Sequence, residues 1–150
     1  MRFFLTAFLC LCVATATDEL EVSVIEFVPT VWDQVQTATC QHVRNITHQN
    51  LQSLRQLITL AAQEGSKLVV LPEYALQGPQ LLSYDAALPW LYNLTQDSIE
   101  GVCGDAVTQL SELASSVGVD IVLNVGEVVW SDNGRKQYNS QVVLSGKNGS

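Results

Sequence analysis

The alternation of helical and extended patterns along the chain is the feature that most constrains its fold. Apolar residues follow helical spacing over 47–64 and 105–117, and a glycine comes directly after each stretch. A run rich in β-branched and other apolar residues follows each helical stretch, at 68–71 and at 120–130, and predicts a strand. Strands that alternate with helices indicate an α/β layer structure rather than a strand sandwich or a helical bundle.

Two more strands and one long connection complete the predicted order. Residues 21–27 are rich in β-branched residues and predict the first strand. The pair at 133–134 is Asn-Gly, a strong turn signal, and 138–144 predicts a strand that returns after it. Residues 77–101 contain prolines, glycines and aromatic residues without a clean periodicity, which favours a long surface excursion. The expected order of elements is therefore β-α-β-α-β-β.

Composition and charge exclude several classes of function. The chain has 150 residues, of which 47% are hydrophobic and 15% charged, so one packed globular domain is expected. The net charge of −8 at pH 7 repels phosphate backbones, and nucleic acid is not expected as a partner. His42 and His48 would lie on different faces of a helix, and no other ligand type or glycine-rich phosphate loop stands at a suitable spacing. The sequence therefore predicts neither a metal site nor a cofactor.

The amino terminus has the parts of a secretory signal peptide. A basic start is followed by an apolar run over 3–13 and by a small-x-small cleavage site at 14–16. As a helix, the apolar run would cross only about half of a bilayer's hydrocarbon core, which argues against a transmembrane anchor. We therefore expect residues 1–16 to be removed and residues 17–150 to be secreted.

The mature chain would keep two cysteines and three glycosylation signals. Cys40 and Cys103 are favoured as structural, because neither has a local nucleophile signature and two cysteines in an oxidising compartment tend to pair. The sequence leaves their pairing open, and a catalytic thiol is the alternative. Sequons at Asn45, Asn93 and Asn148 predict N-linked glycans, in agreement with secretion.

One carboxylate stands out as a candidate for chemistry. Glu73 comes directly after the predicted strand 68–71 and Pro72, at the carboxyl end where α/β sheets place their sites. Buried beside apolar residues, a carboxylate there would accept a proton from a nucleophile at neutral pH. A solvated or helix-capping glutamate in a strand-to-helix loop is the alternative.

Three segments resemble the amino-terminal half of the carbon-nitrogen hydrolase, or nitrilase, superfamily. They are 68–76, 124–127 and 137–143, and they look most like the secreted pantetheinase and biotinidase branch. Pro-Glu after an apolar strand is the most specific piece, and Tyr-Asn before an apolar strand supports it. The resemblance implies that the chain is part of a four-layer αββα sandwich.

The resemblance also implies a reaction. Members of this superfamily hydrolyse amides or nitriles with a Glu, a Lys and a Cys, in which the Glu activates the thiol, the Cys forms a thioester and the Lys stabilises the oxyanion. Glu73 matches the general-base position. Tyr74 departs from the acidic residue common there in pantetheinases and biotinidases, so the resemblance indicates the superfamily more firmly than the substrate. The choice between pantetheine and biotinyl-lysine stays open, because part of the pocket is expected in the other half of the domain.

The other two catalytic residues have no match in this chain. Lys147 stands too early for the lysine, and neither Cys40 nor Cys103 has a suitable context for the nucleophile. We therefore expect residues 17–150 to be the amino-terminal half of a hydrolase domain, ending before the catalytic Lys and Cys. Membrane contact would require an anchor at a later C-terminus, and the oligomeric state is not predicted.

Two functions from different classes follow. In the first, the chain belongs to a longer secreted amidase that acts on a small-molecule amide. In the second, it is a catalytically inactive secreted glycoprotein with a binding role. The first is favoured, because half a sandwich would leave an apolar sheet face uncovered.

Overall fold

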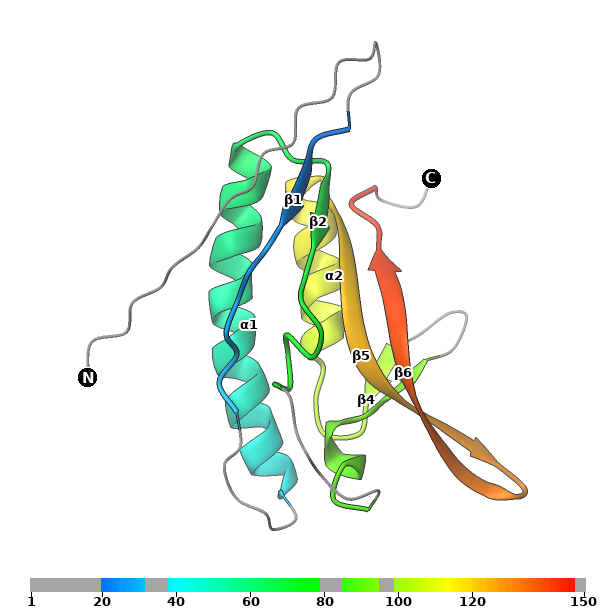
Figure 1. Ribbon diagram of the computed structural model, residues 1–150. Helices are drawn as coiled ribbons and strands as arrows, with labels where there is room; N and C mark the ends of the chain where they lie inside the picture. Colours follow the sequence, from blue (N-terminus) through cyan, green and yellow to red (C-terminus); the bar gives the residue numbers. More distant parts are fainter. Residues whose placement is uncertain (1–19, 32–37, 79–84, 95–98, 148–150) are drawn as a thin grey trace, which may run out of the picture.

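A computed structural model describes residues 20–31, 38–78, 85–94 and 99–147 and shows one mixed sheet with two long helices (Figure 1). The elements are β1 (Val22–Val24), α1 (Cys40–Gln63), β2 (Leu68–Val70), the short 3-10 helix η1 (Leu88–Trp90), β3 (Tyr92–Leu94), β4 (Ile99–Gly101), α2 (Ala106–Val117), β5 (Asp120–Ser131) and β6 (Gly134–Leu144). The α/β fold class that the sequence predicts is confirmed.

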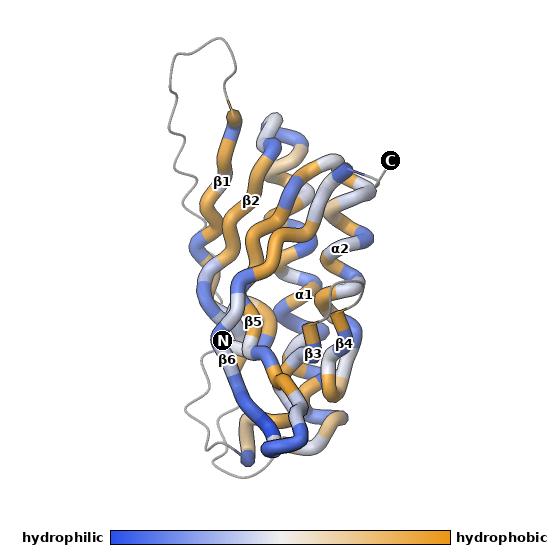
Figure 2. Tube along the Cα trace, turned by 90° about the vertical axis from the view of Figure 1, so that its right-hand side faces the viewer, coloured by the Kyte–Doolittle hydropathy of each residue, from blue (hydrophilic) through white to orange (hydrophobic). Residues whose placement is uncertain are grey.

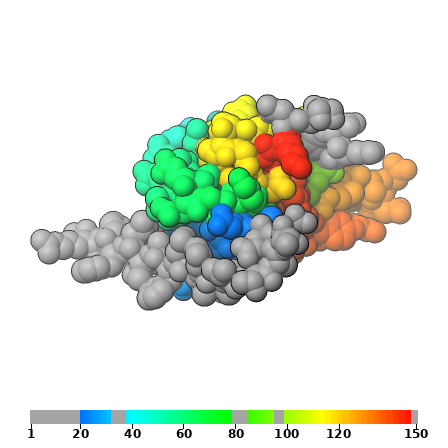
Figure 3. All heavy atoms as spheres, turned by 90° about the horizontal axis from the view of Figure 1, so that it is seen from above, coloured from blue at the N-terminus to red at the C-terminus, as the bar shows by residue number. Residues whose placement is uncertain are grey.

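The sheet has six strands, and β5 lies at its centre. The order is β1-β2-β5-β3-β4, and β6 pairs with the other edge of β5. β1, β2 and β5 run parallel, whereas β5 and β6 form a long antiparallel hairpin that is paired from Ile121 and Leu144 to Ser131 and Gly134. The tip of this hairpin extends past the rest of the molecule (Figures 1 and 3).

Both helices pack on the same face of the sheet (Figure 2). Leu54 and Ile58 of α1 and Leu110 of α2 are completely buried against Ile121 and Leu123 of β5. Each such side chain contributes about 1.5–3 kcal/mol relative to an exposed position.

On the opposite face of the sheet, Val24 of β1 and Val143 of β6 are exposed, whereas Asn124 of β5 is buried. We call it the open face, because α1 and α2 both lie on the other one (Figure 2).

The open face carries residues that alternate with the core positions of each strand. On β5, Asn124 and Gly126 point away from the helices, because Leu123 and Val125 point toward them. Along this face Val143 of β6 is 67% exposed. The described residues therefore form one α layer on one β layer, and the candidate chemistry lies on the uncovered side.

Several predicted boundaries are wrong. The first helix begins at Cys40 rather than at 47, because Thr39 caps it and its side chain accepts a hydrogen bond from the backbone N–H of His42. The expected excursion over 77–101 contains η1, β3 and β4 in its described part. The last strand begins at 134 rather than 138, at the glycine of the predicted Asn-Gly turn.

The predicted signal peptide, residues 1–16, lies outside the described residues. Within the described part of the chain, neither helix combines the length and the apolar character needed to cross a bilayer.

Candidate functional site

The segment after β2 leaves the sheet at a gap in its strand pairing. The backbone N–H of Leu71 donates to the carbonyl of Val122 in β5 across 3.0 Å, one residue beyond the end of β2. Pro72 has no N–H and so cannot extend the pairing on the β1 side. On the same edge of β5, pairing resumes only where Tyr92 of β3 meets Glu127. Glu73 follows Pro72 and therefore stands at this gap, at the carboxyl end of a parallel strand.

Tyr74 turns the chain back at this point. Its φ is +53°, the only positive φ of a non-glycine residue in the described part of the chain. A left-handed backbone costs a bulky residue about 1–2 kcal/mol, so the surrounding contacts must hold it. They include hydrogen bonds at both sides of the residue, from the Tyr74 N–H to Asn124 Oδ1 at 3.2 Å and from the Gly78 N–H to the Tyr74 carbonyl at 2.7 Å.

A chain of side-chain amides connects this turn to Glu73. Because Asn124 Oδ1 accepts from the backbone of Tyr74, its Nδ2 must donate, and it does so to Asn139 Oδ1 and to the carbonyl of Ser140 at 3.3 Å. Asn139 Oδ1 is thus an acceptor, and its Nδ2 donates to Glu73 Oε1 at 2.6 Å. The backbone N–H at the start cannot accept, so the direction of every bond in the chain is fixed.

Glu73 itself is exposed. This solvated position is the alternative that the sequence left open, and burial of the carboxylate in a complete domain stays a prediction. Its position is set by hydrogen bonding instead: Oε1 is held by Asn139, and Oε2 has no partner in the described part of the chain.

A cavity of about 270 Å³ lies beside the amide chain. Its wall combines aromatic rings, side-chain amides and small or apolar residues: Tyr74, Gln77, Gly78, Ala87, Trp90, Leu91, Gly126, Gln137, Tyr138 and Asn139. Leu91 packs directly over the backbone of Gly126, where a Cβ would lie 2.7 Å from Leu91 Cδ2. Asn139 belongs both to this wall and to the hydrogen bond with Glu73, so the cavity and the carboxylate form one site.

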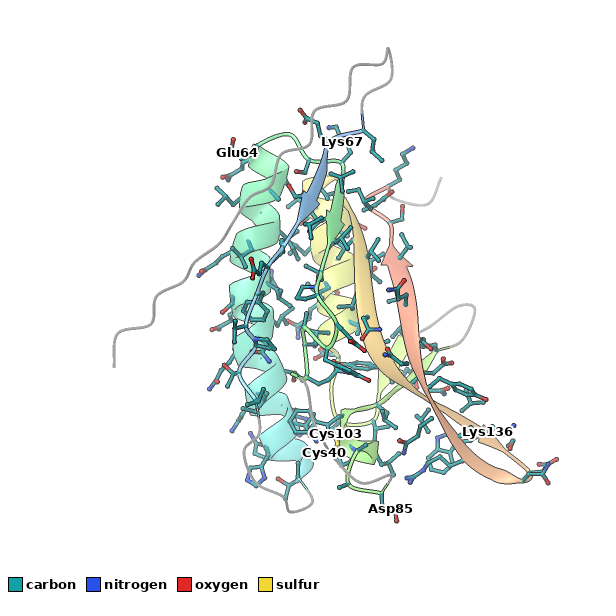
Figure 4. The ribbon with its side chains drawn as sticks, in the orientation of Figure 1. Cys40, Glu64, Lys67, Asp85, Cys103 and Lys136 are labelled. Atoms are coloured by element: carbon teal, nitrogen blue, oxygen red, sulfur yellow. A yellow bond between two sulfur atoms is a disulfide. The ribbon has the colours of Figure 1, made fainter. Side chains whose placement is uncertain are left out.

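The two cysteines of the predicted mature chain are joined in the structure. Cys40, the first residue of α1, and Cys103, between β4 and α2, form a disulfide with their Cα atoms 4.9 Å apart (Figure 4). Arg44 Nε donates to the carbonyl of Cys103 at 3.0 Å, which adds a second link between α1 and the segment before α2. Of the two alternatives for these cysteines, the structure has the disulfide, which leaves neither sulfur as a nucleophile.

The remaining predicted residues lie away from Glu73. Lys147 follows β6, and the last residue of β6, Leu144, pairs with Ile121 near the start of β5. Asn45 is exposed on α1 and Asn93 is half-buried on β3, whereas Asn148 lies outside the described residues.

The two histidines form hydrogen bonds within α1 and its cap. His42 Nδ1 accepts from the backbone of Thr39, and His48 shares a hydrogen bond with Gln52 at 2.9 Å. In the part of the chain that the structure describes, no three His, Cys, Asp or Glu side chains gather in a way that could hold a metal ion.

The sequence interpretation missed Asn124 and Asn139 as site residues, although both lie in the segments that carry the resemblance. A usable signal was present, because asparagine is depleted within strands and here it stands inside two of them. The hydrogen bond between the two side chains depends on the register of β5 and β6, which places Asn139 opposite Gly126, two residues after Asn124.

Comparisons with known proteins establish the family and the fold. A sequence model of the carbon-nitrogen hydrolase family matches residues 35–149. Among solved structures, N-terminal amidase with an Asn-Glu peptide and with a Gln-Val peptide each align with a TM-score of 0.55 at 19% identity, over 87% of this chain. N-terminal amidase with an Asn-Glu-Ala peptide aligns with a TM-score of 0.56 at 19% identity, also over 87% of this chain.

The chain spans 26% of the length of each of these solved structures, and at such low identity the likeness establishes the fold, a nitrilase-type α/β arrangement. No curated protein matches the sequence. The family assignment rests on the sequence model, which covers well over half of the chain. This protein belongs to the carbon-nitrogen hydrolase family.

Proposed function

We propose that the chain is the amino-terminal half of the catalytic domain of a secreted amidase, and that Glu73 is its general base. The observation that carries the proposal is the hydrogen bond from Asn139 to Glu73 in a member of this family. The bond engages Oε1 and leaves Oε2 to accept a proton. A cavity beside the same carboxylate offers room for part of a substrate.

The proposed reaction passes through a thioester. Glu73 takes the proton of a cysteine thiol, and the sulfur attacks the amide carbonyl carbon. A lysine ammonium stabilises the oxyanion, the C–N bond breaks, and Glu73 returns its proton to the leaving amine. Water, deprotonated by Glu73, then attacks the thioester, which releases the acid and restores the thiol. We propose that the remainder of the domain, beyond Ser150, supplies the lysine and the cysteine.

The comparisons support the kind of bond that is cleaved. The similar structures are those of an amidase, crystallised with peptides that begin with Asn or Gln, and one of them carries a cysteine-to-serine substitution. An amide substrate and a thiol nucleophile are therefore the simplest expectation for the complete protein.

The narrower assignment depends on the sequence. The signal peptide, the sequons at Asn45, Asn93 and Asn148, and the segments of resemblance favour the pantetheinase and biotinidase branch. Pantetheine and biotinyl-lysine are the first substrates to test. Tyr74, which replaces an acidic residue of that branch, lines the cavity and gives a physical reason for a difference in substrate.

A binding glycoprotein without catalysis is the second candidate. The observations in its favour are that Glu73 is exposed and that both described cysteines are in a disulfide.

The test uses the full-length protein expressed through the secretory pathway. Glu73→Gln should lower kcat for amide hydrolysis by about a hundredfold or more, because a positioned base is lost, while KM changes little. Glu64→Gln is the matched control, since Glu64 is exposed at the end of α1, far from the site (Figure 4). Unchanged hydrolysis in Glu73→Gln would exclude this residue as the base, and binding of pantetheine without any turnover in the wild type would favour the second candidate.

A further inference from the structure

We propose that a cleft between α1 and the start of α2 holds the first sugar of an N-linked glycan on Asn45. The cleft is a cavity of about 240 Å³, called the helix cleft below, and its wall includes Arg44, Asn45, His48, Gly104, Asp105 and Gln109. It lies in the helix layer (Figure 2) and shares no residue with the cavity at Glu73. The inference rests on secretion and glycosylation, which are part of the proposed function, and it is independent of the amide that is cleaved.

The side chain of Asn45 is oriented for attachment at the rim of the helix cleft. Its Oδ1 accepts a hydrogen bond from Gln41 Nε2 at 2.9 Å, one helical turn earlier in α1. The other amide atom, Nδ2, is the one to which N-linked glycans attach, and it lies on the side away from Gln41. His48 and Leu51 follow Asn45 along α1 and line the cleft. The first sugar, an N-acetylglucosamine, therefore begins next to this cavity.

The wall of the helix cleft offers both a donor and an acceptor to a sugar. The amide nitrogen of Gln52 can only donate, so His48 Nε2 accepts from it at 2.9 Å, and in the neutral ring the proton is on Nδ1. On the α2 side, Asp105 Oδ1 accepts from Gln109 Nε2 at 3.0 Å, which leaves Oδ2 as an acceptor. Sugar hydroxyl groups can bond to both types, and the acetamido group adds one donor and one acceptor.

Gly104 leaves room for the ring. A Cβ at this position would meet only Arg44 Cγ, at 4.0 Å, and the φ of Gly104 is not positive, so the backbone does not require glycine there. Leu51 and Ala106 also line the cleft and are buried, so they offer apolar contact to the methyl of the acetamido group. The volume of about 240 Å³ suits one sugar ring rather than an oligosaccharide.

Covalent attachment makes a weak binding site effective. A sugar joined to Asn45 has an effective concentration in about the millimolar range at the helix cleft, so no tight binding is needed. Each hydrogen bond that the sugar makes to the wall replaces one to water, so the net gain in free energy is small. We therefore expect the seated sugar to shield one side of α1 rather than to stabilise the fold strongly.

His48 and His42 are a matched pair of reporters for the position of the glycan. Each is three residues from Asn45 on α1, but only His48 lines the helix cleft. Diethyl pyrocarbonate modifies histidine, and mass spectrometry of peptides from the full-length secreted protein measures the rate at each position. We expect His48 to react about twofold more slowly in the glycosylated wild type than in Asn45→Gln, and His42 to react equally fast in both. Equal shielding of both histidines, or of neither, would overturn the inference.

A side chain placed in the helix cleft gives an independent test. Gly104→Leu should displace the sugar, so a peptide N-glycosidase should release the Asn45 glycan from the native protein about twofold faster than from the wild type. Thr108→Leu is the matched control, because Thr108 is exposed on α2 and is not part of the wall. An unchanged rate in Gly104→Leu, or equal acceleration in both variants, would contradict the seat.

Failure of the proposed function can be told apart from failure of this inference. Secretion is measured by the protein in the culture medium, and glycosylation by the mass of the peptide that carries Asn45. A secreted protein with no glycan on Asn45, or with one that leaves His48 as reactive as in Asn45→Gln, overturns the inference and leaves the amidase proposal intact. Loss of the general-base assignment, measured by amide hydrolysis in Glu73→Gln, changes neither the shielding of His48 nor the release of the glycan.

Discussion

Asn139 of β6 donates its side-chain amide to Glu73 Oε1 across 2.6 Å and joins two residues that are 66 positions apart in the chain. Asn124 in turn donates to Asn139, and the backbone of Tyr74 donates to Asn124. The Glu73 carboxylate is therefore oriented by a series of hydrogen bonds that begins at the backbone of Tyr74 and ends at Glu73, the residue before it. Such an arrangement replaces the positioning that burial would otherwise provide.

Replacing Asn139 with aspartate should impair catalysis more than folding. Asn139→Asp keeps the shape but replaces the donor by a second carboxylate next to Glu73, so the base loses its orientation and the two groups compete for one proton. We expect kcat of the full-length protein to fall by about tenfold to a hundredfold, with the acid limb of the pH–rate profile displaced. Steady-state kinetics across a pH series would measure both effects.

The control is Asn133→Asp, which introduces the same charge at an exposed position in the turn of the same hairpin. This variant should keep the kinetics of the wild type. If both variants behave alike, or if Asn139→Asp leaves the pH–rate profile in place, the amide of Asn139 does not orient Glu73.

The disulfide should be a major contribution to the stability of the fold. It closes a segment of 63 residues and ties the start of α1 to the chain before α2, where Cys103 packs with Val43 and Trp90. Loop closure of this size is worth about 4 kcal/mol in the chain-entropy model, and measured values are commonly 2–4 kcal/mol. The Cys40→Ala, Cys103→Ala double variant should lose about this free energy of unfolding, measured by urea denaturation. A reductant should lower the stability of the wild type to a similar level and leave the variant unaffected; a wild type insensitive to reductant would contradict the bond.

Local sequence signals predicted the parts of the fold that depend on local periodicity. The apolar stripe of α1, the buried run of β2 and the Pro72-Glu73 junction all lie where the pattern placed them. The first two turns of α1 were missed because their start depends on the cap at Thr39, and because Val43 and Ile46 pack in a separate cluster with Trp90 and Cys103. β3 and β4 were missed because each has three residues and is defined by its neighbours rather than by a pattern of its own.

The site was predictable only in part for the same reason. The position of Glu73 follows from a strand end and a proline, which are local features. Its exposure depends on what covers the open face, and its hydrogen bond depends on the register that sets Gly126 opposite Asn139. Neither the exposure nor the hydrogen bond is encoded in a short window of sequence.

The sequon at Asn45 gives a test of secretion that separates modification from folding. Asn45 is exposed on α1, whereas Thr47 two residues later is buried and its Oγ1 donates to the carbonyl of Val43 at 2.8 Å. In secretory cells, Asn45→Gln should remove one glycosidase-sensitive glycan and change the free energy of unfolding by no more than about 0.5 kcal/mol. Thr47→Ala should remove the same glycan and also cost about 1 kcal/mol for the lost buried hydrogen bond. Thr47→Ser, which preserves both the sequon and the hydroxyl, should retain the glycan; a wild type without any glycan at Asn45 would contradict the prediction.

Tyr92 should make the fold less stable in alkaline solution. Burial raises the pKa of the Tyr92 hydroxyl well above its ordinary value, and the negative charge of Asp105 adds to the rise. In the unfolded chain this hydroxyl ionises near pH 10, while the folded protein still holds the proton. Above about pH 10 the unfolded state therefore binds fewer protons, and the free energy of unfolding falls by up to about 1.4 kcal/mol for each further pH unit.

The contribution of Tyr92 is fully present below about pH 10 and is lost above it, so the comparison with Tyr92→Phe isolates the effect. Urea denaturation between about pH 8 and 11 should show a steeper loss of stability in the wild type than in Tyr92→Phe, which has no hydroxyl to ionise. Asp105→Asn should keep most of the slope, because burial is the larger cause of the raised pKa and the charge of Asp105 the smaller. Parallel loss in the wild type and Tyr92→Phe would mean that other groups, and not this buried hydroxyl, control alkaline unfolding.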